Sequence, residues 1–271
     1  MTTVRALLTE MRQQIPPAEA RLLLGHVLGK SSAWLEAHRD DPVAADVAIQ
    51  MSALAGRRAA GEPIAYLLGV REFYGRDFNV TPAVLIPRPE TELLVDLIKA
   101  QRPVPGRILD LGTGSGCIAI ALALELPPAR LMAVDVSPAA LQVARENAQR
   151  LGAAVEFVES NWFAALLPQR FDVIVANPPY VAAGDPHLGE GDLRHEPATA
   201  LTDHADGLSA IRRIVAAAPG WLRPGGRLLI EHGYDQAAAV AELLCGAGFL
   251  AIEQHLDLAG IVRVSSARIP D

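Results

Sequence analysis

From residue 107 onward the chain alternates short apolar, β-branched runs with longer segments of helical periodicity. Continuous runs of Val, Ile and Leu are typical of parallel strands that are buried on both faces. This alternation predicts an α/β domain, with a parallel sheet between two layers of helices. Because no helix separates the last two strands, we expect them to pair antiparallel at one edge. The seven predicted strands are 107–111, 130–135, 155–158, 171–176, 227–231, 249–255 and 261–267.

The first sixty or so residues show helical spacing and no strand pattern. One helix is predicted over residues 4–15, before Pro16, and a second over residues 18–28. Asp41-Pro42 is typical of an N-cap followed by proline at the first helical position, so we expect a longer helix from there toward Gly61. These helices predict a small bundle. Its role is open between a stabilising cap and a docking module for a partner.

A different pattern connects the two regions. Two short β-like runs, 70–74 and 77–80, flank a turn with Gly75 and predict a hairpin. The proline-rich stretch that follows is expected to be extended, and a helix begins at Pro89 with acids in its first turn. The predicted domains are a helical domain at 1–66, a hairpin and linker at 67–88 and an α/β domain at 89–271.

Composition narrows the class of protein. With 51% hydrophobic and 20% charged residues, the 271-residue chain is expected to be soluble and globular. A net charge of −7 disfavours a broad nucleic-acid-binding surface, because such surfaces neutralise phosphates with Lys and Arg. Two cysteines fit a reducing cytoplasm, and no apolar run approaches the roughly 18 residues of a membrane span. The histidines show no metal-ligand spacing, so we predict no metal site.

A glycine-rich loop follows the first strand of the α/β domain. The run from Asp110 to Gly116, Asp-Leu-Gly-Thr-Gly-Ser-Gly, enters a helix, where glycines allow close backbone approach and the first amides are free. Asp135 ends the next strand, where a carboxylate accepts hydrogen bonds from ribose hydroxyls. Together they indicate a nucleoside-containing cofactor. Alone they do not choose between NAD and S-adenosylmethionine.

The turn Asn177-Pro178-Pro179-Tyr180 follows strand 171–176, at the sheet edge where α/β proteins bind ligands. Its prolines lack N–H groups, so the turn presents carbonyl acceptors, the Asn177 side chain and the flat ring of Tyr180. Such a turn suits a planar NH₂ group. Methylation of an amide needs acceptors that direct the nitrogen lone pair at a sulfonium methyl, whereas nothing in the turn serves hydride transfer. The turn therefore favours S-adenosylmethionine, and it offers no obvious general base.

With these motifs the chain resembles the bacterial protein-(glutamine-N5) methyltransferases that modify peptide chain release factors, the PrmC/HemK family. The Arg-Pro-Glu-Thr-Glu run ending at Glu92 is the most selective match, because generic amino methyltransferases lack it. The resemblance covers nearly the whole length and implies a Rossmann-like, seven-stranded class I S-adenosylmethionine-dependent domain after an all-α domain and a hairpin. The matching segments are the helical N-terminal domain, 72–75, 86–92, 110–116, Asp135, 161–163, 177–180 and 196–197.

The resemblance also implies roles for single residues. The methionine part of the cofactor would contact Gly112, Thr113, Gly114, Ser115 and Gly116. Asp135 would bind the ribose, Trp162 would pack near the adenine and Asn177 would lie beside the methyl donor. The substrate amide would be held by Asn177, Pro178, Pro179 and Tyr180, with Asn177, Pro178 and Tyr180 as catalytic residues and Phe73 as a wall. Arg88, Glu90 and Glu92 would support the active site from outside. Family members commonly have an acid at Asn161, so its contact with adenine is expected to differ.

The implied acceptor is the glutamine of the Gly-Gly-Gln loop in class 1 release factors, whose methylation tunes translation termination. We also expect the protein to be a cytoplasmic monomer that binds neither DNA directly nor a membrane. Two other interpretations stay open. One is a DNA or RNA base-amino methyltransferase, because an exocyclic amine is also a planar NH₂, although the acidic composition counts against it. The other is a nucleoside-binding adaptor whose helical domain recruits a partner. The loop 181–205 is long enough for a lid over the substrate.

Overall fold

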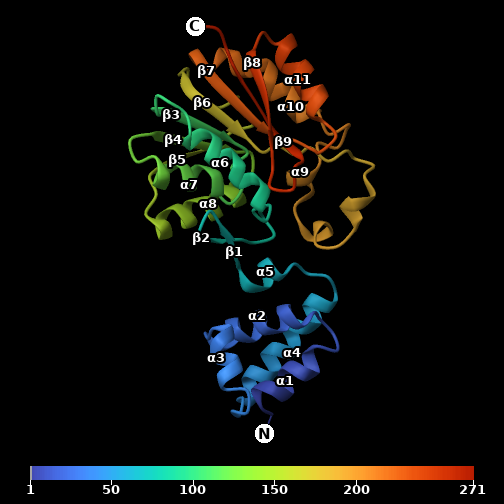
Figure 1. The fold of residues 1–271 in the computed structure, drawn as a ribbon. Coiled ribbons are helices and arrows are strands. Elements are labelled where there is room, and N and C mark those ends of the chain that lie inside the picture. Colours follow the sequence, from blue (N-terminus) through green and yellow to red (C-terminus); the bar gives the residue numbers. More distant parts are fainter. Residues whose placement is uncertain (1) are drawn as a thin grey trace. The chain divides into compact units, whose positions relative to one another are not determined.

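The computed structural model describes residues 2–271 and divides into two compact units, Met1–Val70 and Arg71–Asp271 (Figure 1). The first unit is helical in the residues described. Segment 71–88, predicted as part of a separate linker, belongs to the second unit. The helices of the first unit are α1 (Val4–Met11), α2 (Pro17–Leu28), α3 (Ser32–Ala37), α4 (Ala45–Ala59) and α5 (Ile64–Leu68).

The first unit has its own apolar core. Side chains at helical spacing on α1, α2 and α4 meet there, among them the fully buried Met11, Leu23, Leu24 and Met51. Each such side chain contributes about 1.5–3 kcal/mol when it leaves water. Thr3 caps α1, because its hydroxyl accepts a hydrogen bond from the Ala6 amide at 3.2 Å. The periodicity seen in the sequence is therefore the buried face of this bundle.

The predicted start of the long helix at Asp41-Pro42 is wrong. Helix α4 begins at Ala45, and its N-cap Ala44 makes no side-chain hydrogen bond. Residues 41–43 instead pair with the start of the chain, where the Val4 amide donates to the Asp41 carbonyl at 3.1 Å. This pairing keeps the Asp41-Pro42 backbone extended. Helix α5 was not predicted, because its five residues are too few to show a period.

The second unit is built on a seven-stranded sheet with the order β5-β4-β3-β6-β7-β9-β8. Five strands are parallel, and β9 runs antiparallel to both β7 and β8. The predictions of an α/β class, of seven strands and of a final antiparallel pair are thus confirmed. The strands are β3 (Arg107–Leu111), β4 (Arg130–Asp135), β5 (Val155–Glu159), β6 (Phe171–Ala176), β7 (Leu222–Glu231), β8 (Leu250–Leu256) and β9 (Val262–Arg268).

Helices cover both faces of this sheet (Figure 1). Alternate residues of each central strand enter different cores, as when Val173 and Ile174 of β6 pack on opposite sides. One core includes residues of α6 (Glu92–Lys99) and α7 (Cys117–Glu125), with Ala148 of α8 (Pro138–Leu151). The other includes α10 (Ser209–Ala217) and α11 (Ala237–Gly246). The sheet is therefore buried on both sides, as its apolar strands predict.

The strand order reverses between β3 and β6. From β3 the chain moves outward through β4 to β5, and it then returns to β6 on the other side of β3. Loops leaving the carboxyl ends of two strands at such a reversal diverge and leave a crevice. The glycine-rich loop leaves β3 there and the Asn-Pro-Pro-Tyr turn leaves β6. A separate two-stranded hairpin, β1 (Val70–Phe73) and β2 (Arg76–Asn79), precedes the sheet, and the 3₁₀ turn η1 (Pro89–Thr91) leads into α6.

Candidate active site

A cavity of about 300 Å³ lies at this crevice. Its volume is at the lower end of the range usual for small-molecule sites. Three groups of residues line it: the loops after β3, β4, β5 and β6, the linker before η1, and the segment that follows Glu196. The lining residues are Ala83, Val84, Leu85, Gly112, Gly114, Asp135, Val136, Ser137, Ala139, Ala140, Ser160, Asn161, Trp162, Asn177, Pro179, Pro197, Thr199 and Ala200.

The glycine-rich loop presents backbone rather than side chains to this cavity. Gly112 and Gly114 have φ of +74° and +55°, and both line the wall. A Cβ on Gly112 would lie 3.4 Å from the Trp162 ring, so even a methyl group there would crowd the space beside that ring. Thr113 points away and its hydroxyl donates to the Asp110 carboxylate at 2.7 Å.

Asp110 anchors the loop from beneath. Its side chain is completely buried, and one carboxylate oxygen has no hydrogen-bond partner within residues 2–271. Burial raises the pKa of Asp110 to about 7, with the hydrogen bond from Thr113 acting in the opposite direction and the charge of Asp135 adding to the rise. Asp110 therefore lies under the loop and is not part of the cavity wall.

Asp135 lines the cavity, and its carboxylate can accept further hydrogen bonds. One carboxylate oxygen accepts from the Gly114 amide and the other from the Ser137 amide, each at 2.9 Å. Each oxygen of a carboxylate has two lone pairs, so one on each remains for a ligand hydroxyl. Burial raises the pKa of Asp135, and the backbone hydrogen bonds act to lower it. Val136 beside it is 61% exposed, an apolar surface that a flat ligand would cover.

Trp162 closes the cavity on the side of β5. Its backbone has φ of 54°, a left-handed conformation, and the Ser160 hydroxyl donates to its carbonyl at 2.8 Å. The same hydroxyl accepts from the Ala165 amide at 3.0 Å, so Ser160 holds the turn on both sides. Cavity, glycine backbone, carboxylate and indole together fit a nucleoside with a flat base and ribose hydroxyls.

The Asn177 turn forms the opposite wall. The Asn177 Nδ2 donates to the Thr91 hydroxyl at 3.2 Å, and among residues 2–271 no hydrogen bond to Oδ1 is found, so Oδ1 can accept one from a ligand. Pro179 lines the cavity beside it. Tyr180 ends the turn, and its hydroxyl donates to Glu231 at 3.4 Å. Burial raises the pKa of the Tyr180 phenol, so this group stays protonated at neutral pH.

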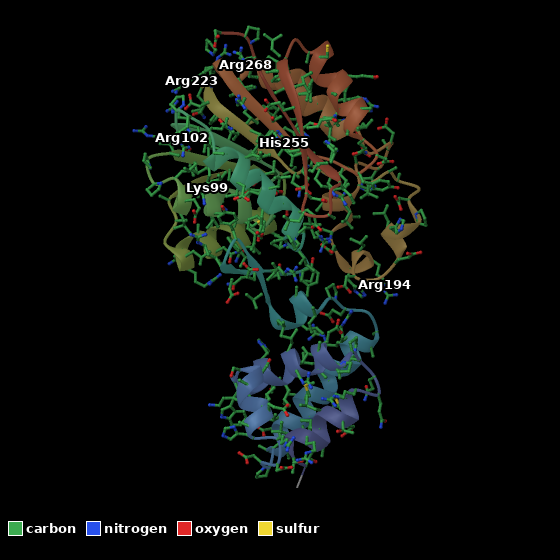
Figure 2. The ribbon with its side chains drawn as sticks, in the orientation of Figure 1. Lys99, Arg102, Arg194, Arg223, His255 and Arg268 are labelled. Atoms are coloured by element: carbon green, nitrogen blue, oxygen red, sulfur yellow. The ribbon has the colours of Figure 1, made fainter. Side chains whose placement is uncertain are left out.

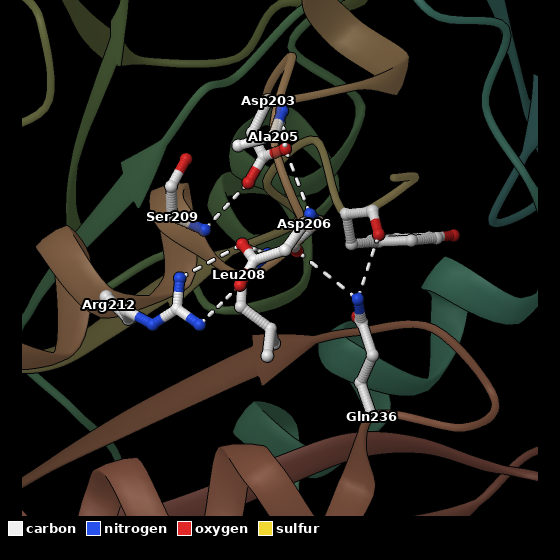
Figure 3. Close-up of polar contacts among 9 residues, drawn as sticks. Asp203, Ala205, Asp206, Leu208, Ser209, Arg212 and Gln236 are labelled. Atoms are coloured by element: carbon white, nitrogen blue, oxygen red, sulfur yellow. Dashed lines mark hydrogen bonds and ion pairs between the residues drawn. The ribbon is translucent and has the colours of Figure 1, made fainter. Parts of the chain in front are cut away.

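The far end of the turn is fixed by a polar cluster that includes Asp203, Ser209 and Gln236 (Figure 3). Gln236 Nε2 donates to the carbonyls of Tyr180 at 2.9 Å and Gly207 at 3.3 Å. Gly207 has φ of +78°, and a Cβ there would lie 2.3 Å from the Tyr180 carbonyl oxygen. Asp203 accepts from the amides of Gly207 and Ser209 at 3.0 and 2.7 Å. These hydrogen bonds and the close contact at Gly207 therefore fix the backbone conformation after Pro179.

The segment 181–205 carries short structure of its own: η2 (Pro186–Gly189), η3 (Leu193–His195) and α9 (Ala198–Leu201). Glu196, whose side chain is fully buried, connects this segment to the linker. It accepts from the Ile86 amide at 3.0 Å and pairs with Arg88. Residues on each side of this clamp line the cavity, namely 83–85 together with Pro197, Thr199 and Ala200. Glu196 therefore holds two of its walls together.

Comparison with known proteins decides the family. Residues 89–190 match the model of the methyltransferase small domain, and residues 1–69 match that of the PrmC N-terminal domain. The release factor glutamine methyltransferase of Burkholderia pseudomallei is 54% identical over 263 residues, which cover 93% of this chain and 92% of that one. Its namesake in Bordetella pertussis is 53% identical over 268 residues, which cover 98% of each. The chain belongs to the release factor glutamine methyltransferase family.

A solved structure shares the fold. The Thermus thermophilus 16S rRNA N2 G1207 methyltransferase, in complex with AdoMet and guanosine, has a TM-score of 0.53 and 21% identity, over 74% of this chain and 49% of that one. At this identity the likeness shows the fold alone. The predictions of the family and of the enzyme class are confirmed, and with them S-adenosylmethionine as the methyl donor of the family.

The structure separates the predicted site residues of this methyltransferase into two groups. The cavity wall includes Gly112, Gly114, Asp135, Trp162, Asn177 and Pro179. The side chains of Thr113 and Ser115 in the same loop are buried and do not line the cavity, and Gly116 packs against α8. Pro178 is buried and Tyr180 contacts Glu231 rather than the cavity.

Phe73, expected to wall the substrate pocket, is not among the residues that line this cavity. It is 1% exposed in the core under α6, with its ring edge-on to Phe78 at 6.0 Å between centroids. Sequence reasoning also missed Ser160, Thr199 and the linker residues 83–85 of the wall. Glu196 was noted as part of the family match but not as a site residue. The match at Glu196-Pro197 is the feature of the sequence that indicates the cavity wall formed by Pro197, Thr199 and Ala200.

A second hollow, of about 710 Å³, lies around the amino ends of β3, β6 and β7. Figure 2 labels Arg102, Arg223 and His255, which line it. Arg223 pairs with Asp172 at 2.7 Å, so part of the positive charge is neutralised locally. Within residues 2–271 we find no group of three or more His, Cys, Asp and Glu side chains placed to hold a metal, and no helix with the length and apolarity to cross a membrane.

Proposed function

We propose that this chain transfers a methyl group from S-adenosylmethionine to the side-chain amide nitrogen of the glutamine in the Gly-Gly-Gln loop of class 1 release factors. The observation that carries the proposal is the free Oδ1 of Asn177, which borders the cavity that Asp135 and Trp162 also line. Oδ1 accepts one N–H of the substrate amide, and the lone pair of that nitrogen then points into the cavity. Membership of the release factor glutamine methyltransferases selects the substrate.

The cofactor supplies a methyl carbon bound to a positively charged sulfur. Asp135 would hold the ribose through its two spare lone pairs, Trp162 would pack on the base, and the backbone of Gly112 and Gly114 would approach the methionine part. In the transfer a carbon–nitrogen bond would form and the carbon–sulfur bond would break, with its electron pair left on sulfur, while the nitrogen would lose its proton to solvent. An amide nitrogen is a weak nucleophile, so positioning by Asn177 and by the carbonyls of the turn supplies most of the catalysis.

The proposal extends to partners and place of action. The helical unit, Met1–Val70, would dock the release factor, and the protein would act as a monomer in the cytoplasm without direct DNA binding. The net charge of −7 supports a protein rather than a nucleic-acid substrate. Size-exclusion chromatography with light scattering measures the oligomeric state. A molar mass of a dimer would contradict the proposal that the protein acts as a monomer.

Transfer of labelled methyl groups tests the activity. Purified protein with labelled S-adenosylmethionine should label a class 1 release factor, and replacement of the loop glutamine by alanine should abolish the label. Asn177→Ala should lower kcat by about 10² with the fold intact, because the lost acceptor acts on the transferring nitrogen. An unchanged kcat would remove Asn177 from the mechanism. Label on DNA or ribosomal RNA in place of the release factor would support a base-amino methyltransferase instead.

A further inference from the structure

A buried side-chain amide of α8 contacts the glycine-rich loop, and none of the roles above includes it. Asn147 is fully buried, and its Nδ2 donates to the Ser115 carbonyl of the loop at 3.0 Å. Nδ2 also donates to the Asn79 carbonyl of β2 at 2.9 Å, and Oδ1 accepts from the Asn79 amide at 2.7 Å. Both N–H groups of the side-chain amide are thus used. Asn147 therefore joins α8, the end of β2 and the loop after β3.

The position of Asn147 on α8 explains why a polar side chain is buried there. Ala144, one turn earlier on the same face of the helix, packs against the loop, because a Cβ on Gly116 would lie 3.1 Å from Ala144 Cβ. Asparagine is a poor helix former, and its amide is costly to bury unless hydrogen bonds replace those to water. An apolar side chain at this position would leave the Ser115 carbonyl without its donor.

The hydrogen bond to Ser115 fixes the orientation of one peptide group of the loop. The Ser115 carbonyl accepts from Asn147, and the amide of the same peptide group, that of Gly116, donates to the Thr113 carbonyl at 2.9 Å. Because a peptide group is planar, a hydrogen bond at each end sets its rotation about the chain. Gly114 directly precedes Ser115 and lines the cavity. A rotation of this peptide group would therefore move the cavity wall at Gly114.

We propose that Asn147 is a positioning residue for cofactor binding. Its hydrogen bond to Ser115 holds the loop backbone in place against the amino-acid part of S-adenosylmethionine. The inference rests on the proposed function, which places that part of the cofactor at Gly112 and Gly114. Asn147 is not among the residues that line the cavity, so it acts through the loop.

The adenosine part of the cofactor depends on other contacts. It would be held by Asp135 and Trp162, and within residues 2–271 no hydrogen bond connects Asn147 to either of them. Asp135 accepts from the Ser137 amide at 2.9 Å, and this anchor remains when the loop shifts. Loss of the Asn147 side chain should therefore weaken the binding of the amino-acid part and leave the binding of the adenosine part unchanged.

Two ligands that differ in the amino-acid part test this separation. S-adenosylhomocysteine and 5′-methylthioadenosine share the adenosine and a sulfur atom, but only the first has the amino-acid part. In calorimetry with the full chain, Asn147→Ala should raise the Kd of S-adenosylhomocysteine by about tenfold or more, because the loop backbone no longer has one orientation. The Kd of 5′-methylthioadenosine should stay within about threefold of the wild-type value. An equal rise for both ligands, or an unchanged Kd of S-adenosylhomocysteine, would overturn the proposal.

A second variant keeps the size of the side chain. Asn147→Asp retains an oxygen that accepts from the Asn79 amide, but in place of the NH₂ group it has an oxygen that cannot donate to both carbonyls. The same separation is expected, with a rise in Kd of about tenfold or more for S-adenosylhomocysteine and about threefold or less for 5′-methylthioadenosine. If circular dichroism shows that neither variant folds, Asn147 serves the fold as a whole and the proposal is wrong.

Arg150, on the same helix, provides a matched control. Its guanidinium donates to Asn147 Oδ1 at 3.3 Å and to the Asp77 carbonyl of β2, and within residues 2–271 it makes no hydrogen bond to the loop. Arg150→Ala should weaken the attachment of α8 to the hairpin and leave the hydrogen bond to Ser115 in place. Both Kd values should then stay within about twofold of the wild type. A Kd of S-adenosylhomocysteine raised as much as in Asn147→Ala would mean that the hairpin contact controls binding, and would contradict the proposal.

The ligand measurements need no release factor, so their outcome is separate from that of methyl transfer. A wild type that binds the two ligands equally would refute the placement of the amino-acid part at the loop, and with it the inference. A wild type that favours S-adenosylhomocysteine, with the same preference in Asn147→Ala, would refute the role of Asn147 alone. If the wild type methylates no release factor, the proposed substrate fails, and the difference between the two ligands still tests Asn147.

Discussion

At the scale of single residues, the glycines of the loop after β3 have different tasks. Gly116 has φ of +83°, and a Cβ there would lie 2.8 Å from Ile120 Cδ1 and 3.1 Å from Ala144 Cβ. Gly114 has φ of +55° but nothing within 4 Å of such a Cβ. We expect Gly116→Ala to lower the free energy of unfolding by about 2–4 kcal/mol and Gly114→Ala by about 1 kcal/mol. Urea denaturation measures both, and equal losses would contradict the packing role of Gly116.

Single residues also show how far the sequence could predict the site. Asp135 and Asn177 could be placed because each directly follows a recognisable buried strand. The position of Phe73 could not, because it ends a four-residue strand in which no other residue is buried, and so short a strand does not reveal its inner face. Nor could the hydrogen bond between Asn177 Nδ2 and the Thr91 hydroxyl, because it joins residues that are far apart in the sequence.

At the scale of elements, the Glu196 clamp between the linker and segment 181–205 holds two walls of the cavity together. Glu196→Ala would leave the Ile86 amide unpaired and Arg88 without its buried partner. The walls at 83–85 and 197–200 should then separate, and the Kd of S-adenosylmethionine should rise by about tenfold or more. Calorimetry measures this Kd, and Glu190→Ala, at an exposed residue of segment 181–205, is the control. Equal Kd values for the two variants would contradict the clamp.

The elements were predicted unevenly for physical reasons. The strands of the sheet and the helices that cover it are easy to predict. Because both faces of the sheet are buried, the strands are continuous apolar runs and the helices show a clear hydrophobic period. The start of α4 was misplaced because Asp41-Pro42 follows local capping rules that the pairing of residues 41–43 with the start of the chain overrides. The short turns η2, η3 and α9 of segment 181–205 could not be predicted, since each has too few residues for a periodic pattern.

At the scale of the whole molecule, two buried acids make stability depend on pH. The pKa of Asp110 and that of Glu231 are each raised to about 7 by burial. The folded state therefore holds more protons than the unfolded state below that pH, and stability is lost as pH rises through it. Without cofactor, we expect the free energy of unfolding to fall by about 1–2 kcal/mol from pH 6.5 to pH 8.

Denaturation in urea at the two pH values measures this fall. The lowered pKa values of His232 and His255 act in the opposite sense, but mainly below the ordinary value of 6.5, where the unfolded state still binds their protons. Glu231→Gln should reduce the fall by about half, because one of the two acids is then absent. A free energy of unfolding that is flat or rises across this window would contradict the buried-acid account.

The most direct measurement concerns the side chain that receives the methyl group. Tandem mass spectrometry of class 1 release factors, purified from cells with and without this protein, locates that group on the peptide. The account predicts one methyl on the side-chain amide nitrogen of the Gly-Gly-Gln glutamine in cells that contain the protein, and none in cells that lack it. The same modification state of that glutamine in both cell types, or a methyl that depends on the protein but lies on another residue, would contradict it.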